Sequence, residues 1–345
     1  MSRHNGSGAA ITASLAVVVL LLLAYALVAC GGTSSTASSS PRAATTSAEP
    51  SRRAAPLPTP TVAGTIAFAK VRAAGSLYSD ICVVRSDGAE LKTVHRSRPH
   101  RALNPAWSPD GGTIAFTACQ LDGGVATAAL GVMRADGAFL ASLTDGRTHG
   151  DEAAWSPDGT RIAFARSWST GRAAIFVMNG GGYMSADGAD LRRVTRPAAG
   201  TRAAAQADRS PAWAPDGKIL FLRSGDVFAV DPDGSGLTPL TDVGSIAEFA
   251  LSPDGRRIAI SDGKRDRVVV MAAHGGGHPV TLLEPVSDYA ASDGQSRDAT
   301  LAWAPDGKAL ALATSAGLYI VNADGSGLSA VPGVGAALDP AWRPQ

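Results

Sequence analysis

Six residues with side-chain oxygens occupy the same place in a repeated motif, and they are the first candidates for chemistry. Each stands three positions before a Trp, or before Leu251 in one copy. The six are Asn104, Glu152, Ser210, Glu248, Thr300 and Asp339. Because three are carboxylates and none is basic, the set could attract a cation such as calcium, or a Lys or Arg side chain of a partner. The simpler alternative, which we favour, is a polar surface that binds nothing.

The elements that must position these residues repeat every 38 residues (Trp213 to Leu251) to 58 residues (Trp155 to Trp213). The five full copies of the motif Ala-Trp/Leu-Ser/Ala-Pro-Asp-Gly are 106–111, 154–159, 212–217, 250–255 and 302–307. Pro at the second turn position and Gly where φ must be positive predict a tight hairpin with a bulge. A second strand, a continuously apolar third strand such as Ile175–Met178 and a short fourth strand follow. Four-stranded sheets covered on both faces indicate propeller blades.

The two ends of the repeat region predict how the blades close into a ring. Residues 340–344 resemble a first strand with no successor, and Thr65–Phe68 resembles a second strand with no predecessor. Pairing them would complete a blade and remove two exposed sheet edges. We therefore expect an all-β, six-bladed β-propeller over residues 63–345, with four-stranded antiparallel blades. The C-terminal strand would close the ring by joining the N-terminal three strands, and the repeated Trp would fill the wedge between blades, with a thinner contact at Leu251.

The motif Trp-Ser-Pro-Asp-Gly, followed by Ile-Ala-Phe, a Val-rich strand and a Leu-Thr ending, resembles the repeat of TolB-like β-propellers, which are relatives of WD40-repeat proteins. The resemblance covers residues 65–344. It implies that the first strand of each blade is innermost, so that the six oxygen-bearing residues ring one mouth of a central channel. The longest connections would surround that mouth and form a second candidate binding set. Its members are His100, Arg101, His149, Asp151, Arg209, Tyr289 and Arg297.

The first thirty residues are typical of an export signal. Arg3 and His4 precede an apolar run, which ends in Leu27–Val28–Ala29–Cys30. That ending resembles the lipobox of bacterial lipoproteins, which implies cleavage after residue 29 and a lipid on Cys30. An uncleaved membrane anchor is the alternative, since the apolar run is just long enough to span a bilayer. Residues 30–62, rich in Ser, Thr, Ala and Pro, would form a flexible tether. We expect an extracytoplasmic domain held at the cell membrane.

Three further patterns could carry chemistry, and each has a structural alternative. His274–His278 contains the letters of an oxyanion-loop motif, but it stands where other copies have a hairpin turn. Asp231–Gly236 with Asp242 matches a calcium-loop spacing, although strands rather than helices flank it. Cys82 and Cys119 could form a disulfide in an exported domain, or remain buried thiols. We favour the hairpin, the structural turn and the free thiols.

The remaining evidence favours a binding scaffold over an enzyme. A net charge of +1 provides no field for nucleic acid, and no Gly-x-Ser-x-Gly nucleophile elbow occurs. We predict a monomer, without a cofactor other than possible calcium at the mouth. It would bind a protein, peptide or glycan of the cell envelope through the face that carries the long connections. The alternative is a hydrolase or lyase that uses Glu152 and Glu248 as acid and base. A third option is an accessory module that acts only with a separate chain.

Overall fold

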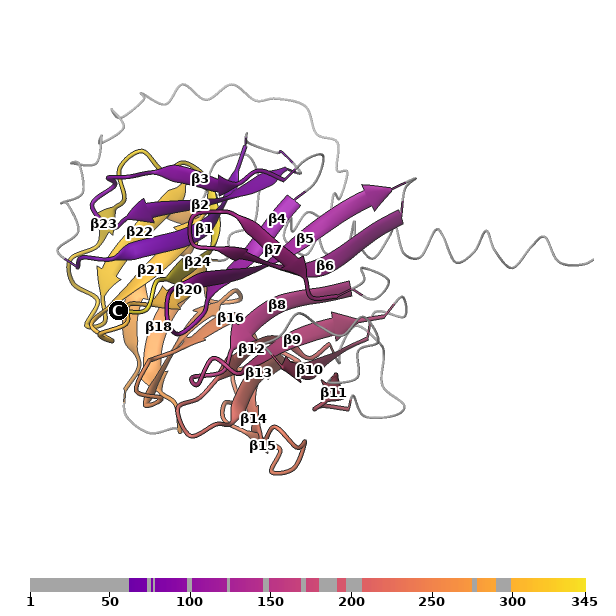
Figure 1. The fold of residues 1–345 in the computed structure, drawn as a ribbon. Helices are drawn as coiled ribbons and strands as arrows, with labels where there is room; N and C mark the ends of the chain where they lie inside the picture. The colour runs from indigo at the N-terminus through magenta and orange to yellow at the C-terminus, as the bar shows by residue number, and fades with distance from the viewer. Residues whose placement is uncertain are drawn as a thin grey trace, which may run out of the picture.

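In the part of the chain that the structure describes, twenty-four strands form six blades of four antiparallel strands (Figure 1). The computed structural model describes residues 62–72, 76, 78–97, 101–122, 125–144, 149–168, 172–179, 191–196, 207–274, 278–289 and 299–345. No helix in these ranges is long and apolar enough to cross a membrane. The expected all-β propeller is confirmed.

Each blade is written from its innermost to its outermost strand, and the blades are numbered I to VI. Blade I consists of β24 (Ala337–Trp342), β1 (Thr65–Val71), β2 (Ser79–Arg85) and β3 (Lys92–His95). Blade II consists of β4 (Arg101–Trp107), β5 (Thr113–Asp122), β6 (Val125–Arg134) and β7 (Phe139–Ser142). Blade III consists of β8 (His149–Trp155), β9 (Arg161–Ser167), β10 (Ala173–Asn179) and β11 (Arg192–Arg193). Blade IV consists of β12 (Arg209–Trp213), β13 (Ile219–Arg223), β14 (Asp226–Val230) and β15 (Thr238–Pro239). Blade V consists of β16 (Ile246–Leu251), β17 (Arg257–Asp262), β18 (Arg267–Ala272) and β19 (Val280–Leu283). Blade VI consists of β20 (Thr300–Trp303), β21 (Ala309–Thr314), β22 (Gly317–Asn322) and β23 (Ser329–Ala330).

The Ser-Pro-Asp-Gly turn joins the first two strands of a blade through a repeated set of local hydrogen bonds. In blade II the Gly111 N–H donates to the Ser108 carbonyl at 2.8 Å, and Gly111 has φ of 65°. The Asp110 carboxylate accepts the Ser108 hydroxyl at 2.6 Å and the Gly112 N–H at 2.9 Å. A side chain with a Cβ is strained at this φ, so glycine is required. The predicted hairpin is confirmed, and the Asp holds it closed.

The hydrophobic core is divided among the interfaces between blades. Six clusters of buried side chains occur, and each draws its members from two neighbouring blades. The second strands of blades I to IV each contribute a fully buried aromatic ring to this core. These rings are Phe68, Phe116, Phe164 and Phe221. Because no cluster lies within one blade, a blade acquires its core only from its neighbours.

The repeated Trp connects neighbouring blades by a hydrogen bond as well as by packing. In four blades the indole N–H donates to the carbonyl of the Ala that precedes the Trp (or Leu251) of the preceding blade. These bonds join Trp107 to Ala341, Trp155 to Ala106 and Trp213 to Ala154, each at 3.2 Å, and Trp303 to Ala250 at 3.0 Å. The Trp342 indole N–H is shielded from solvent and has no partner among the described residues. Leu251 has no indole N–H, so the interface between blades IV and V lacks this hydrogen bond, and Leu251 packs against the cluster there as a partly buried side chain.

An arginine reinforces three of these interfaces. Its guanidinium lies over the indole ring of the next blade, an arrangement that favours a cation. Arg161 stacks on Trp213 with 4.6 Å to the ring centroid, and Arg257 stacks on Trp303 with 4.7 Å. Arg343 stacks on Trp107 and also donates to the Gly111 carbonyl at 3.0 Å.

The ring closes where β24 pairs with β1 in antiparallel register. Ile66 is opposite Trp342, and Ala67 is opposite Ala341. The Arg343 N–H extends this ladder by donating to the Thr65 carbonyl at 2.8 Å. Figure 1 shows the yellow β24 beside the indigo β1, although the two strands are about 270 residues apart in the chain. The closure predicted from the two chain ends is therefore confirmed.

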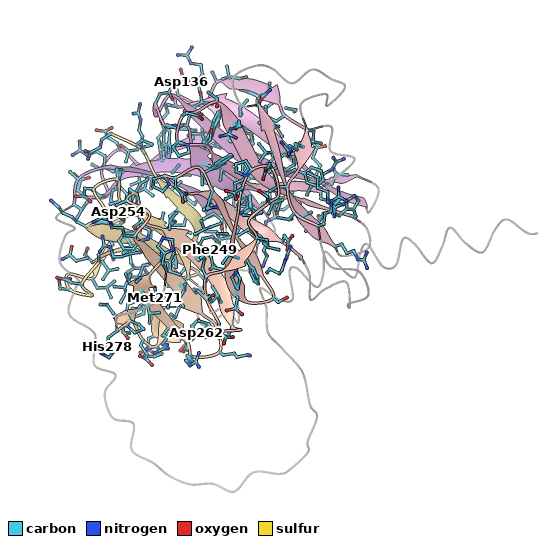
Figure 2. The ribbon with its side chains drawn as sticks, turned by 90° about the horizontal axis from the view of Figure 1, so that it is seen from below. Asp136, Phe249, Asp254, Asp262, Met271 and His278 are labelled. Atoms are coloured by element: carbon cyan, nitrogen blue, oxygen red, sulfur yellow. The ribbon has the colours of Figure 1, made fainter. Side chains whose placement is uncertain are left out.

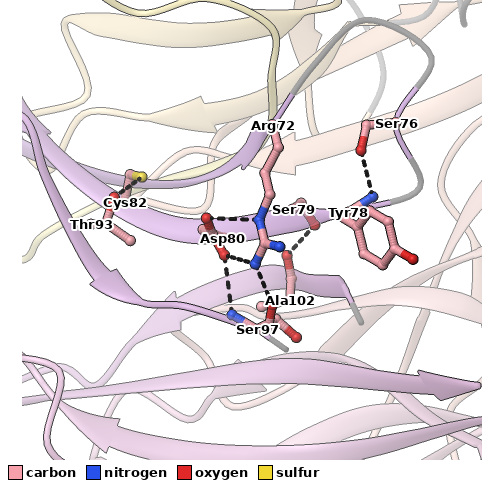
Figure 3. A network of polar contacts seen from close by, with 9 residues as sticks. All are labelled: Arg72, Ser76, Tyr78, Ser79, Asp80, Cys82, Thr93, Ser97 and Ala102. Carbon is pink, nitrogen blue, oxygen red and sulfur yellow. Dashed lines mark hydrogen bonds and ion pairs between the residues drawn. The ribbon is translucent and has the colours of Figure 1, made fainter. Parts of the chain in front are cut away.

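Blades I and II are not separate sheets. One parallel bridge between Ser79 and Arg101 joins them into a single eight-stranded sheet. Figure 3 shows the contacts at this junction. The Ser79 hydroxyl donates to the Ala102 carbonyl at 2.7 Å. Asp80 accepts the Ser97 N–H at 3.1 Å and also pairs with Arg72. These bonds hold the connection from blade I to blade II against the sheet.

Removing residues 338–345 should abolish cooperative folding. The deletion removes most of β24, so blade I keeps three strands and two sheet edges become exposed. We expect the thermal transition followed by circular dichroism to broaden and to fall to much lower temperature. Deletion of Gln345 alone, which lies beyond β24, is the control. An unchanged melting temperature for the longer deletion would refute ring closure.

Trp155→Phe should destabilise the domain more than Trp342→Phe. Both substitutions remove one ring of an interface side chain, but only Trp155 loses a hydrogen bond to the neighbouring blade. A buried carbonyl left without its donor costs about 1 kcal/mol or more. Urea unfolding of the two variants measures the difference, and equal losses would show that the indole hydrogen bond contributes nothing.

Candidate functional site

The six oxygen-bearing residues meet around one cavity of about 150 Å³. One residue comes from the innermost strand of each blade, and all six line the cavity. They are Asn104 on β4, Glu152 on β8, Ser210 on β12, Glu248 on β16, Thr300 on β20 and Asp339 on β24. Figure 2 shows Phe249, the neighbour of Glu248, near the middle of the molecule, with Asp136 and His278 toward its edge. Alignment of the repeats alone was sufficient to find this set.

Local backbone distortion explains why these side chains are directed into the channel. Four of the six have the positive φ that residues other than glycine rarely adopt: 50° at Asn104, 54° at Glu152, 51° at Ser210 and 52° at Asp339. The register of the innermost strand shifts at each of these positions, and it also shifts beside Glu248. Such β-bulges reorient a side chain and occur often at barrel rims and functional sites. Thr300 is different, because β20 pairs with β21 without a shift.

Some of the six residues fasten one blade to the next. The Thr300 hydroxyl accepts the Asp339 N–H at 2.8 Å, and the Asp339 carboxylate accepts the Asn104 N–H at 3.1 Å. In the same sense around the ring, the Glu152 carboxylate accepts the Ser210 N–H. The bulges turn these N–H groups away from the strand ladder, so they need acceptors elsewhere. We call these three bonds the ring latches. They could not be predicted from the sequence, because it does not reveal where a bulged N–H points.

A second tier of the cavity is apolar, and the analysis of the repeats did not single it out. It consists of the residue that follows each of the six. The tier comprises Pro105, Ala153, Pro211, Phe249, Leu301 and Pro340, all buried. Three are prolines, which suit an innermost strand because no partner lies beyond it to accept an N–H. The aligned copies do show an apolar residue at this position in every repeat. Apolar residues in a strand are, however, expected to belong to the core, so the pattern does not by itself indicate a cavity lining.

The surroundings of the three carboxylates favour their neutral forms. Burial raises the pKa of Glu248 to about 8, and the charge of Glu152 adds to the effect. Burial, followed by the charge of Asp151, raises the pKa of Glu152 to about 7. Burial also raises the pKa of Asp339 to about 6, against the hydrogen bond from Asn104. A nearby cation would stabilise the ionised forms, and Arg209 does so in part for Glu152 and Glu248.

The second candidate set divides into two groups. Arg101, His149, Asp151 and Arg209 lie at the starts of innermost strands, beside the ring. Asp151 accepts hydrogen bonds from the Asn104 amide at 2.6 Å and from the Glu152 N–H at 2.8 Å, so it supports the ring.

Tyr289 lies elsewhere, because it packs edge-on against Tyr319, with 5.3 Å between ring centroids, at the interface of blades V and VI. It ends the short 3₁₀ helix η2 (Val286–Tyr289). His100 and Arg297 lie outside the described residues.

The alternative chemical patterns have structural explanations. The Asp231 carboxylate pairs with Lys218 at 2.7 Å, so this carboxylate already has a cationic partner in that loop. No three His, Cys, Asp or Glu side chains in the described ranges are grouped closely enough to hold a metal. Cys82 and Cys119 are both free thiols, but Cys119 is only half-buried. His274 and His278 flank residues that are not described.

A larger cavity, of about 240 Å³, lies between blades I and II and includes none of the six ring residues. It arises where Phe116 faces Gly131 across the strand pair, whereas the matching pairs Phe164–Phe176 and Phe221–Phe228 each have two rings. His95 partly fills the space, with 4.7 Å between its ring centroid and that of Phe116. Burial lowers the pKa of His95, so its neutral form is favoured. The sequence analysis missed this cavity because a single glycine in a strand gave no signal.

Comparisons with known proteins agree with this architecture. TolB from Acinetobacter baumannii is similar in structure, with a TM-score of 0.63 and 22% identity over 82% of this chain and 67% of that chain. A chain of the nidogen/laminin complex has a TM-score of 0.60 at 12% identity, covering 81% of this chain and 98% of that chain. XC5397 from Xanthomonas campestris, described as a gluconolactonase, has a TM-score of 0.51 at 17% identity, covering 82% and 91%.

At these identities the three structures support the fold alone. No curated protein matches the sequence significantly. The family model described as TolB beta propeller domain, PD40, matches residues 62–345, which is most of the chain. The resemblance found in the repeats is thereby confirmed, and the chain belongs to the TolB beta propeller domain family.

Proposed function

We propose that this propeller is a binding scaffold of the cell envelope whose channel mouth receives a cationic group of a protein, peptide or glycan partner. The observation that carries the proposal is the composition of the ring. Its six members all offer oxygen atoms, three are carboxylates and none is basic. A cation bound in such a ring, half-buried and backed by an apolar tier, would stabilise the ionised forms of the carboxylates that burial disfavours.

The fold itself does not decide between binding and catalysis. One structural relative comes from a protein complex and another is described as a gluconolactonase. Function therefore has to be argued from the site. Two of the ring latches use carboxylates, Asp339 and Glu152, and groups held in structural hydrogen bonds suit a rigid docking rim.

A hydrolase or lyase is the second candidate, and one observation favours it. Glu152 and Glu248 have pKa values of about 7 and about 8, in the range where a carboxyl group exchanges protons near neutral pH. Glu152, however, accepts the Ser210 N–H, and blade IV separates its blade from that of Glu248. This arrangement supports recognition better than a paired acid and base.

Anchoring at the membrane completes the proposal. It rests on the sequence ending at Cys30, which lies outside the described residues. A lipid at Cys30 and a tether over residues 30–62 would hold the propeller near partners in the envelope. Loss of lipid labelling in Cys30→Ala would support the anchor, and unchanged labelling would remove it.

Neutralising the ring should abolish partner binding. We expect the full chain, cross-linked in envelope membranes, to capture a partner. Hexylammonium ions should displace this partner, and high salt should weaken its binding. Combined Glu152→Gln, Glu248→Gln and Asp339→Asn should lose that partner, while Glu90→Gln, a change at an exposed carboxylate, should keep it. Equal capture by the neutralised ring would overturn the proposal. Turnover of a lactone or glycan that disappears in Glu152→Gln would favour the enzyme instead.

Glu248→Gln should stabilise the propeller at high pH and have little effect at low pH. Because the pKa of Glu248 is raised to about 8, the neutral carboxyl stabilises the fold most fully below the ordinary glutamate value of about 4.3. This contribution is lost as pH rises through about 8. Melting temperatures at pH 4 to 9 should show wild type falling below the variant by several degrees at the alkaline end. Parallel curves would show that Glu248 ionises normally.

A further inference from the structure

The ring latches divide the six residues into two groups. Thr300, Asp339 and Glu152 each accept a backbone N–H from the next blade, and Asp339 and Glu152 do so with carboxylate oxygens. Removing such an acceptor leaves a bulged N–H without a partner, which costs stability. These residues therefore have a structural task that does not depend on a ligand.

Glu248 and Ser210 have no such task. One Glu248 oxygen accepts the N–H of the adjacent Phe249 at 3.0 Å, and the other accepts no hydrogen bond from the described residues. The Ser210 hydroxyl oxygen is shielded from solvent and has no partner among the same residues. Both side chains line the axial cavity, on the neighbouring strands β12 and β16.

A shielded hydroxyl without a partner is rare in folded proteins, and it often indicates a ligand or an ordered water. Here that hydroxyl and a carboxylate with an oxygen to spare lie on the innermost strands of neighbouring blades, and both line the same axial cavity. Together they present two acceptors on one side of the ring, whereas the latches engage the Thr300 hydroxyl and one carboxylate oxygen of Asp339 on the other.

We propose that Glu248 and Ser210 form the recognition pair of the channel, and that they bind a primary ammonium group, such as that of a lysine side chain or a peptide amino terminus. This inference rests on the proposed binding function and specifies its ligand. Asp339, Glu152 and Thr300 are positioning residues that hold the blades in the spacing the pair requires.

The chemistry of the acceptors selects an ammonium over the other cations. An ammonium offers three donors from a compact centre, which suits a carboxylate oxygen and a hydroxyl on adjacent strands. Calcium needs six to eight oxygens, and a guanidinium needs a planar fork of acceptors. The free oxygens of this pair are too few for either.

Charges around Glu248 determine how binding depends on pH. Glu152 and Asp339 disfavour its ionised form, and Arg209 partly opposes them. A bound ammonium would favour ionisation, so binding should release a proton and strengthen as pH rises from 6 toward 8. Above the pKa of the amine, binding should weaken again.

The test uses the full chain and a pentapeptide with blocked termini, whose only charge is that of one central lysine, titrated by calorimetry at pH 8. We expect Glu248→Gln and Ser210→Ala to weaken binding about ten- to a hundred-fold, as for the loss of a hydrogen bond to a charged group. Neither variant should lower the melting temperature. Glu90→Gln, a change at an exposed carboxylate outside the ring, is the matched variant and should keep the affinity of the wild type. The same peptide with its lysine acetylated is the control and should not bind.

The outcomes separate this inference from the function on which it depends. If the wild-type protein binds neither the lysine peptide nor calcium, both the recognition pair and the proposed binding function are overturned. Wild-type binding that survives in both Glu248→Gln and Ser210→Ala would overturn only the recognition pair. Calcium that binds and displaces the peptide would overturn the choice of an ammonium ligand, but it would leave a cation-binding ring in place.

Discussion

The antiparallel pairing of β24 with β1 is the constraint on which the rest of this structure depends. Every hydrophobic cluster lies between two blades, so an open ring would leave two blade faces without a core. The pairing also brings Asp339 from the end of the chain to Asn104 and Thr300. Closure therefore assembles the candidate site as well as the fold, and the two cannot be separated energetically.

The sequence was sufficient for features whose physical cause is local and repeated. The Pro-Asp-Gly turns, the apolar strands and the position of Asn104 and its counterparts all follow from a motif that occurs five times in full. Ring closure could be predicted because Thr65–Phe68 and the segment around Trp342 each lacked a partner strand in their own repeat.

Other features could not be predicted, because they depend on how distant segments meet. The latch from Asp339 to Asn104 requires a bulge in each strand, and neither bulge has a sequence signature. The parallel bridge from Ser79 to Arg101 joins blades that the repeats show as separate. The indole of Trp342 lacks the hydrogen bond that four other copies make, although Trp342 also follows an Ala and stands three residues after an oxygen-bearing residue.

The ring combines two demands that usually conflict. Carboxylates in a confined channel are costly to ionise, and the raised pKa values of Glu152, Glu248 and Asp339 reflect this cost. Hydrogen bonds to bulged N–H groups offset part of the cost for Asp339 and Glu152. Glu248 receives only the N–H of its own neighbour, so a cationic ligand has the most to contribute there.

Amide hydrogen exchange across 337–342 and 65–71 tests ring closure most directly. If β24 completes blade I, its hydrogen-bonded amides should exchange as slowly as those of β20, the innermost strand of an unbroken blade. Exchange of the C-terminal segment within seconds, while β20 stays protected, would contradict a closed ring and the channel built from it.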